Sequence, residues 1–219
     1  MSVPAIADPG APLSPWAAFA LAYLAGSIPF GLLLARARGV DLRSIGSGNI
    51  GATNATRALG RAGGVAVFLL DFGKGLVPVL ALPPLVAWGA SPRTVAVSVG
   101  AAAVLGHCFP PWLRFRGGKG VSTCAGAVMG VDPALVAVGV LAWLAVALST
   151  RYAGLASLAL VGAFPLAALW LHRADRGLAL GMTGIFLLIV VRHRSNIARM
   201  LAGTEPRMRA FRRREAVDG

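Results

Sequence analysis

Charged side chains are scarce in this sequence of 219 residues. Asp, Glu, Lys and Arg together make up 13% of the chain, about half of the share that is usual in soluble domains. Hydrophobic residues make up 57%, and the mean hydropathy is +0.73. This composition has too little charge to cover a water-soluble globule and too much apolar content for a disordered chain. We therefore expect a polytopic membrane protein.

Cysteine and acidic residues are also rare. The two cysteines, Cys108 and Cys124, lie in or beside apolar runs without metal-ligand spacing, so we expect them to be small core residues. No metal-ligand cluster is visible, and we predict no metal and no cofactor. The 8 acidic residues against 21 Lys and Arg leave a net charge of +13. Cytoplasmic loops that face anionic lipid account for such an excess in a membrane protein, so we predict no nucleic-acid partner.

Long apolar runs predict an all-α integral membrane protein with seven transmembrane helices. A span needs about 20 apolar residues. Polar or basic breaks separate seven runs, at residues 15–35, 62–88, 94–113, 120–131, 134–149, 154–171 and 178–191. No basic segment precedes the first run, so we do not expect a cleaved signal peptide. Residues 1–205 are predicted to form a single membrane domain, and residues 206–219 a basic cytoplasmic tail.

The distribution of Lys and Arg orients these spans. Of the 21 Lys and Arg, 17 fall in segments on one side of the predicted membrane, namely 36–61, 114–119, 151 and 192–219. By the positive-inside rule this side faces the cytoplasm. The N-terminus is then outside and the C-terminus inside, and the basic tail is expected to bind anionic lipid.

The first unusual polar segment covers residues 46–57. Gly46, Gly48 and Gly51 fit the GxGxxG pattern, but no strand precedes them, which excludes a dinucleotide-binding fold. We expect Ser47 or Asn49 to cap a short helix that begins near Gly51. The free N–H groups of that helix could hold an anion, with Arg57 further along it. The alternative is a solvated interfacial helix with its cap.

The second segment, residues 106–120, places glycines on both sides of Lys119 at Gly117, Gly118 and Gly120. This pattern resembles a phosphate cradle, although it is not a Walker A loop, because glycine follows the lysine. The chain has only two lysines, so a retained lysine indicates that a compact ammonium is needed at position 119. Alternatively Lys119 is a positive-inside anchor, as we expect for the neighbouring arginines. His107 is expected to be a packing residue.

The third segment covers residues 193–205. His193 and Asn196 are spaced i, i+3, which predicts that both face one side of a helix leaving the membrane, with Arg199 continuing that face. A basic interfacial helix is the alternative, but Asn196 and Glu205 add nothing to lipid binding. A functional site is therefore favoured. Within the second span, Asp71 and Lys74 at i, i+3 are predicted to form a buried charge pair.

Together these segments make the sequence similar to the bacterial acyl-phosphate:glycerol-3-phosphate acyltransferases, the PlsY family. The matching strings are GSIPFG at 26–31, SGNIGATN at 47–54, DFGKG at 71–75, GHCFPPWLRFRGGKGVST at 106–123 and HRSNIARMLAGTE at 193–205. The resemblance implies a seven-span enzyme of the bacterial inner membrane with its active site on the cytoplasmic face. It also implies transfer of a fatty acyl group from acyl phosphate to the 1-hydroxyl of glycerol 3-phosphate, giving lysophosphatidic acid and phosphate.

The resemblance also assigns the candidate site. By motif position the catalytic residues correspond to Ser47, Ser157, His193 and Asn196, of which Ser157 has the least motif around it. The substrate- and phosphate-binding residues correspond to Thr53, Asn54, Arg57, Gly117, Gly118 and Lys119. The partners implied are acyl phosphate, glycerol 3-phosphate and the lipid bilayer, for a monomer or a homodimer.

Two other functions are compatible with a basic membrane protein. A transporter for an anionic phosphorylated solute also needs basic residues at helix ends, but transporters usually show internal repeats with polar residues near the midplane. Here the polar motifs lie on one predicted face and no repeat is visible. A non-catalytic scaffold would leave the Gly-Lys and His/Asn motifs unexplained. The general base stays open between His193 and a substrate phosphate.

Overall fold

The computed structural model describes residues 13–86 and 88–208, and in these residues every regular element is helical. The α-helices are α1 (Pro15–Gly26), α2 (Phe30–Arg36), α3 (Ala52–Ala81), α4 (Pro92–Cys108), α5 (Val121–Val131), α6 (Pro133–Thr150), α7 (Ala153–Leu171), α8 (Arg176–Arg192) and α9 (Arg194–Leu201). Two 3-10 turns, η1 (Pro83–Leu85) and η2 (Pro111–Leu113), follow α3 and α4. The predicted all-α class is confirmed.

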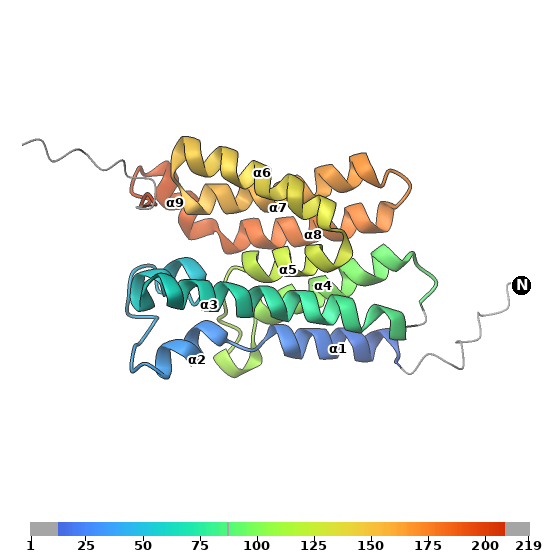
Figure 1. Ribbon diagram of the computed structural model, residues 1–219, viewed down its shortest axis with the longest axis horizontal. Helices are drawn as coiled ribbons and strands as arrows, with labels where there is room; N and C mark the ends of the chain where they lie inside the picture. Colours follow the sequence, from blue (N-terminus) through green and yellow to red (C-terminus); the bar gives the residue numbers. More distant parts are fainter. Residues whose placement is uncertain (1–12, 87, 209–219) are drawn as a thin grey trace, which may run out of the picture.

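The longer helices lie along a common axis (Figure 1). Helices α4 and α5 occupy the middle of the bundle, with α1 and α3 on one side and α6, α7 and α8 on the other. The most extensive packing joins α3 with α5, α6 with α7, and α1 with α4. The short helices α2 and α9 lie at the same end of the bundle. Loops far apart in the sequence therefore meet there.

In the part of the chain that the structure describes, five helical segments are long and apolar enough to cross a membrane. They are Pro15–Arg36, Ala52–Leu85, Pro92–Leu113, Pro133–Thr150 and Ala153–Leu171. Helices α8 and α9 form a sixth candidate, bent by 58° at the break between them. Helix α5 is apolar but has only 11 residues, which gives it a length of about 17 Å against a hydrocarbon core of about 30 Å.

The outer faces of the bundle are apolar. Leu166 is 69% exposed and Leu180 is 72% exposed, and both belong to helices of the bundle. Exposed leucines at this density are the expected surface for contact with lipid chains, while backbone polar groups stay bonded inside each helix. The surface thus agrees with the membrane protein that the composition predicts.

The first predicted span, 15–35, is broken. Helix α1 ends at Gly26 and α2 begins at Phe30, with Pro29 between them. Proline has no N–H to donate and disfavours helical geometry in the residue before it. The carbonyl of Ile28, which the break leaves without a helical donor, accepts from Phe30 N at 3.1 Å and from the Lys74 ammonium at 2.7 Å.

The short helix predicted near Gly51 is confirmed, but its predicted capping is wrong. Helix α3 begins at Ala52 with Gly51 as the N-cap, and neither Ser47 nor Asn49 supplies a side-chain cap. Gly60, with φ +75° and ψ −179°, then interrupts the helix and separates the first two turns from the apolar part. Such a positive φ is accessible to glycine at little cost.

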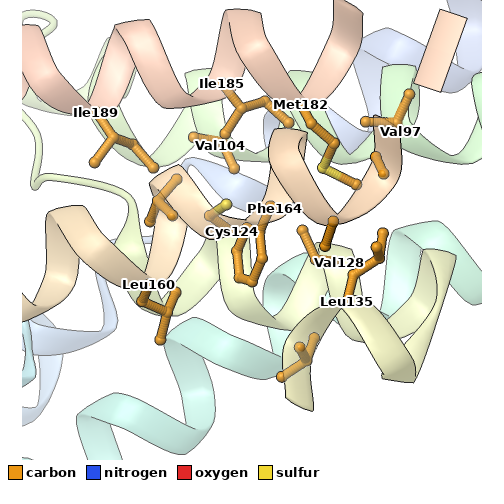
Figure 2. Close-up of a cluster of buried hydrophobic side chains, with 14 of the residues drawn as sticks. Val97, Val104, Cys124, Val128, Leu135, Leu160, Phe164, Met182, Ile185 and Ile189 are labelled. Atoms are coloured by element: carbon orange, nitrogen blue, oxygen red, sulfur yellow. The ribbon is translucent and has the colours of Figure 1, made fainter. Parts of the chain in front are cut away.

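The largest core cluster joins the middle helices to α6, α7 and α8 (Figure 2). Phe164 of α7 is 1% exposed and packs on Gly139 of α6, where an added Cβ would lie 2.3 Å from the ring. This close approach explains how α6 and α7 pack along their length. Cys108 and Cys124 are fully buried, free thiols, which confirms that they are small core residues.

Candidate active site

The three unusual polar segments come together at one end of the bundle. We call it the basic end, and it comprises residues 36–57, 114–119, 151 and 192–207. It holds α2, the start of α3, the loop before α5, and α9 (Figure 1). All of the predicted site residues except Ser157 belong to these loops and helix ends.

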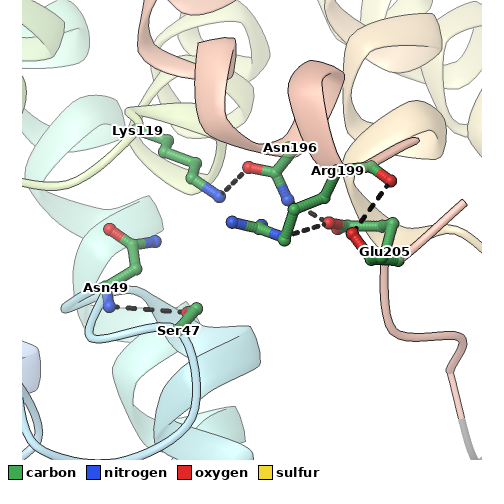
Figure 3. A network of polar contacts seen from close by, with 7 residues as sticks. Ser47, Asn49, Lys119, Asn196, Arg199 and Glu205 are labelled. Atoms are coloured by element: carbon green, nitrogen blue, oxygen red, sulfur yellow. Dashed lines mark hydrogen bonds and ion pairs between the residues drawn. The ribbon is translucent and has the colours of Figure 1, made fainter. Parts of the chain in front are cut away.

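A chain of four polar side chains forms the centre of this end (Figure 3). The Lys119 ammonium donates to Asn196 Oδ1. Asn196 Nδ2 donates to Glu205 Oε1 at 2.6 Å, and Arg199 Nε donates to Glu205 Oε2 at 2.7 Å. Asn196 is 5% exposed and Glu205 is 8% exposed. Because Asn196 is bonded on both sides, its amide orientation is set by the carboxylate and the ammonium together.

The charges around Lys119 are mostly positive. Burial lowers the pKa of the Lys119 ammonium to about 8, since the charged form is the one that loses hydration. Glu205 opposes this shift, whereas Arg199, Arg57 and Arg192 add to it. Arg57, from α3, therefore lies close enough to act on a lysine that follows it by more than 60 positions. The Arg199 guanidinium lies beside the ammonium in Figure 3.

The loop that carries Lys119 is held by the protein itself. The N–H of Gly117 donates to Cys108 O and that of Gly118 to His107 O, both at 3.1 Å. These amides are therefore not free to cradle a phosphate, so the predicted role of the Gly117 and Gly118 backbone as ligand donors needs correction. What the positions require is small size: an added Cβ would lie 2.1 Å from His107 O at Gly117 and 2.1 Å from His107 Nε2 at Gly118.

Arg192 is a site residue that the sequence did not single out. Its Nη2 donates to Gly117 O at 2.8 Å and its Nε to Gly118 O at 3.0 Å. Its guanidinium also lies 5.2 Å from the centre of the Phe109 ring. A planar fork with parallel donors suits two successive carbonyls. We had counted it only as a positive-inside charge, and no local motif distinguishes it from such an anchor.

The Ser47 loop is organised around Asn54. Asn54 is 1% exposed, its Oδ1 accepts from Ser47 N, and its Nδ2 donates to the carbonyls of Leu42 and Ile45, each at 3.0 Å. Its amide is thus used inside the loop, which favours a positioning role over the predicted substrate contact. Ser47 and Thr53 are exposed, and the Ser47 hydroxyl accepts only a long 3.4 Å contact from Asn49 N. Both hydroxyls can meet a ligand.

His193 does not lie within one continuous helix with Asn196, as the i, i+3 spacing had suggested. It occupies the break between α8 and α9. Its Nδ1 lies 2.8 Å from Ile189 O, which can only accept. The proton is therefore on Nδ1, and Nε2 has the free lone pair. Lys119 and Glu205 both act on this ring electrostatically.

Ser157 lies on α7, away from the loops. A Cβ added to Gly154 of the same helix would lie 3.0 Å from Asn196 Nδ2. Ser157 is one helical turn further along, so it shares the face that meets α9. It is half-buried. Ser157 therefore lies one helical turn along α7 from the point where Gly154 approaches Asn196.

This arrangement can bind multiply charged anions and donate hydrogen bonds, but it offers little else. Two cations from distant segments, Lys119 and Arg57, act on each other electrostatically, and the exposed Ser47 and Thr53 precede Arg57 in the chain. No group of three His, Cys, Asp or Glu that could hold a metal occurs in residues 13–86 and 88–208. The nearest carboxylate, Glu205, is already bonded to Asn196 and Arg199. Phosphate-bearing ligands fit this chemistry best.

Comparisons with known proteins agree with this chemistry. The family model described as glycerol-3-phosphate acyltransferase matches residues 16–203. A glycerol-3-phosphate acyltransferase of Geobacter sulfurreducens is 47% identical over 192 residues, which cover 87% of this chain and 96% of the relative. One of Aquifex aeolicus is 46% identical over 189 residues, covering 85% and 95%.

Solved structures extend the similarity to the fold. The crystal structure of PlsY (YgiH), an integral membrane glycerol 3-phosphate acyltransferase, in its glycerol 3-phosphate form has a TM-score of 0.82 with 42% identity. It covers 89% of this chain and 95% of its own. Its lysophosphatidic acid form has a TM-score of 0.80. The chain therefore belongs to the glycerol-3-phosphate acyltransferase family, whose members are acyl-transferring enzymes.

Proposed function

We propose that this protein transfers a fatty acyl group from acyl phosphate to the 1-hydroxyl of glycerol 3-phosphate, giving lysophosphatidic acid and phosphate. The observation that carries the proposal is the Lys119 ammonium, bonded to Asn196 and surrounded by Arg57, Arg192 and Arg199. Both substrates bear a phosphate, so a site with this many cations suits both. The relatives are named for glycerol 3-phosphate; acyl phosphate as donor rests on the resemblance of the motifs.

Each cation has a separate task in this proposal. Lys119 binds one phosphate as a compact ammonium, and Arg57 binds the second from the opposite loop. Asn196 and Ser47 donate hydrogen bonds to substrate or to the oxyanion that develops on the acyl carbonyl. Contacts of this class contribute about 2.7–4 kcal/mol of transition-state stabilisation per donor. Arg192 and Asn54 hold the two loops in place through backbone contacts.

The reaction needs no covalent acyl-enzyme. Acyl phosphate is a mixed anhydride with a good leaving group, so the glycerol hydroxyl attacks the acyl carbon directly. A new C–O ester bond forms and the C–O bond to phosphate breaks. The hydroxyl proton passes to His193 Nε2, whose lone pair is free, or to the departing phosphate. In this proposal Ser157, one helical turn along α7 from Gly154, donates to the acyl end of the donor.

The proposed enzyme lies in a bacterial inner membrane with seven spans, its N-terminus outside and the basic end in the cytoplasm. The positive-inside rule supports this orientation. Single cysteines at Gly89 and Ala174 should react with an impermeant maleimide added to intact cells. Cysteines at Ser44 and Arg116 should not react until the membrane is opened. Labelling of 44 and 116 with protection of 89 and 174 would invert the orientation.

The reaction itself is tested with purified protein in lipid vesicles. Palmitoyl phosphate is supplied with and without glycerol 3-phosphate, and released phosphate and lysophosphatidic acid are both measured, with heat-inactivated protein as the background. We expect both products only when both substrates are present. Uptake of glycerol 3-phosphate into the vesicles without turnover would instead support a transporter. Turnover with palmitoyl-CoA alone would reassign the donor.

A further inference from the structure

Three ionisable side chains are buried inside the bundle, outside the site described above. Asp71 and Lys74 belong to α3 and His107 to α4, and they are 2%, 7% and 4% exposed. The Lys74 ammonium lies 2.7 Å from Asp71 Oδ1, which confirms the predicted charge pair. His107 Nδ1 faces the same carboxylate oxygen at 3.7 Å. Ionisable groups inside a membrane bundle cost free energy, so they indicate a function unless they only pair with each other.

One side of this trio holds the break between α1 and α2. The Lys74 ammonium donates to Ile28 O at 2.7 Å and lies 5.7 Å from the centre of the Phe30 ring. Ser27, next to the break, accepts from Trp112 Nε1 at 2.7 Å. The string GSIPFG and the turn η2 are thus joined at this point, although neither contributes a residue to the phosphate site.

The other side of the trio supports the Lys119 loop. The carbonyl of His107 accepts from Gly118 N at 3.1 Å, and its ring is so close to Gly118 that an added Cβ would lie 2.1 Å from Nε2. The imidazole is therefore the surface on which the residue before Lys119 rests. With Nδ1 toward Asp71 and Nε2 against Gly118, this ring has no free edge for substrate.

We propose that Asp71, Lys74 and His107 are positioning residues for Lys119. They transmit the position of the α1–α2 break through the His107 ring to Gly118, and so set where the ammonium stands relative to Asn196. This inference rests on the proposed function only in that Lys119 is the phosphate ligand. Well-packed apolar residues could often replace a buried ion pair without loss of stability, so the polar trio supplies geometry that an apolar core would not.

The lysine count makes a direct test possible. Lys74 and Lys119 are the only lysines in the chain, so reductive ¹³C-methylation yields two lysine NMR signals, and Lys74→Met assigns them. In wild-type protein we expect the Lys119 signal to titrate near pH 8, because burial lowers its pKa to about 8. In His107→Leu, which keeps an apolar side chain under Gly118, the loop should loosen and admit water, and the Lys119 titration should move toward that of a free lysine.

Activity gives the second readout. We expect kcat/KM to fall by about 30-fold or more in His107→Leu. The double variant Asp71→Leu/Lys74→Met leaves no unpaired charge. It should show the same loss of kcat/KM and the same shift of the Lys119 titration, while it still elutes as a single monodisperse species. The matched control is His172→Leu, which breaks the His172–Asp132 pair of 2.7 Å in another part of the bundle. It should change neither readout.

The outcomes separate this inference from the proposed function. A Lys119 signal that still titrates near 8 in both variants, with kcat/KM within threefold of wild type, would overturn the positioning role. If wild-type protein shows no acyl transfer at all, the proposed function fails. The Lys119 titration then still decides whether the trio sets the environment of the ammonium.

Discussion

The two ends of the bundle treat their polar groups in opposite ways. At the end away from Lys119, the Asp175 carboxylate accepts from the hydroxyls of Ser91 and Thr94 and from Leu178 N. Asp132 accepts from Ala134 N and pairs with His172. Each acid thus joins two helices, and its hydrogen-bonding capacity is used within the protein. These contacts hold helix ends together.

At the basic end the positive charges exceed what the protein neutralises. Among residues 13–86 and 88–208, Arg199 is the one cation of this end in an ion pair with a carboxylate, that of Glu205. Lys119 is held by the neutral amide of Asn196 instead. Lys119 therefore keeps its charge available to a ligand, whereas the oxygens of Asp175 and Asp132 at the other end accept hydrogen bonds from several groups of the protein. The basic end therefore has charges that can bind a ligand, whereas the acids of the opposite end hold helices together.

The largest effect should come from Asn196, which links the Lys119 ammonium to Glu205. In Asn196→Ala, Lys119 and Glu205 each lose a partner and the proposed oxyanion donor disappears. Loss of one such donor typically lowers kcat by about 10²–10³-fold, and we expect a fall toward 10³-fold in kcat/KM. Melting temperature and size-exclusion profile check the fold. A well-folded variant within tenfold of wild type would remove Asn196 from the catalytic residues.

The next effect is a pH dependence that belongs to the basic end. Burial lowers the pKa of Lys119 to about 8, so the free enzyme loses the ammonium charge as the pH rises through 8. Substrate phosphates have their second pKa near about 6 and stay dianionic across this range. The profile of kcat/KM should therefore fall roughly 20-fold between pH 7.5 and 9.5. Recovery after return to pH 7.5 excludes denaturation, and a flat profile would contradict a buried, binding ammonium.

At the opposite end the same kind of change should affect stability alone. Asp175→Ala removes two hydrogen bonds that join the starts of α4 and α8, and the side-chain cap on Leu178 N of α8. A lost helix cap typically costs about 1 kcal/mol, so we expect Tm to fall by about 2–4 °C for a chain of this size. Turnover per folded molecule should stay within twofold. A large loss of activity without a change in Tm would show that this end also contributes to the site.

The smallest effect on turnover is expected for the tail. Residues 209–219 lie outside the described residues, but their basic side chains predict attraction to anionic lipid of about 1 kcal/mol each near the surface. Deleting residues 207–219 should lower membrane retention or yield more than kcat. Turnover per inserted molecule, compared with full-length protein in the same lipid, checks this. Near-total loss of kcat would place the tail in the site.

The sequence predicts the helices well because burial in lipid depends on the local density of apolar side chains. The break between the apolar runs 120–131 and 134–149 and the short helix at Gly51 both follow from local residue chemistry, and both are confirmed. The break at Pro29 was missed, since the residues around it are as apolar as a continuous span. Its stabilising contact comes from Lys74, 46 positions away, and local pattern carries no information about that distance.

The site was predictable where a residue type is unusual for its surroundings. Lys119 is conspicuous in a chain that otherwise uses arginine, and the structure brings it together with Asn196 and Arg57. The role of the Gly117 and Gly118 amides was misjudged, because a glycine pair signals either free N–H groups or a close approach. Only the position of His107 decides between them. Arg192 was missed because a clamping arginine and a membrane anchor have the same sequence signature.

The most direct test of the basic end as a phosphate site is Lys119→Arg, with Arg116→Lys as the control in the same lipid. The Lys119 ammonium is hydrogen-bonded to Asn196. A larger planar guanidinium cannot occupy the position of this compact ammonium. We predict a loss of at least about 10²-fold in kcat/KM, or about 2.7 kcal/mol of transition-state stabilisation. The exposed Arg116 should tolerate lysine with little change. Activity of Lys119→Arg within a few-fold of wild type would contradict the assignment and make Lys119 a topological anchor.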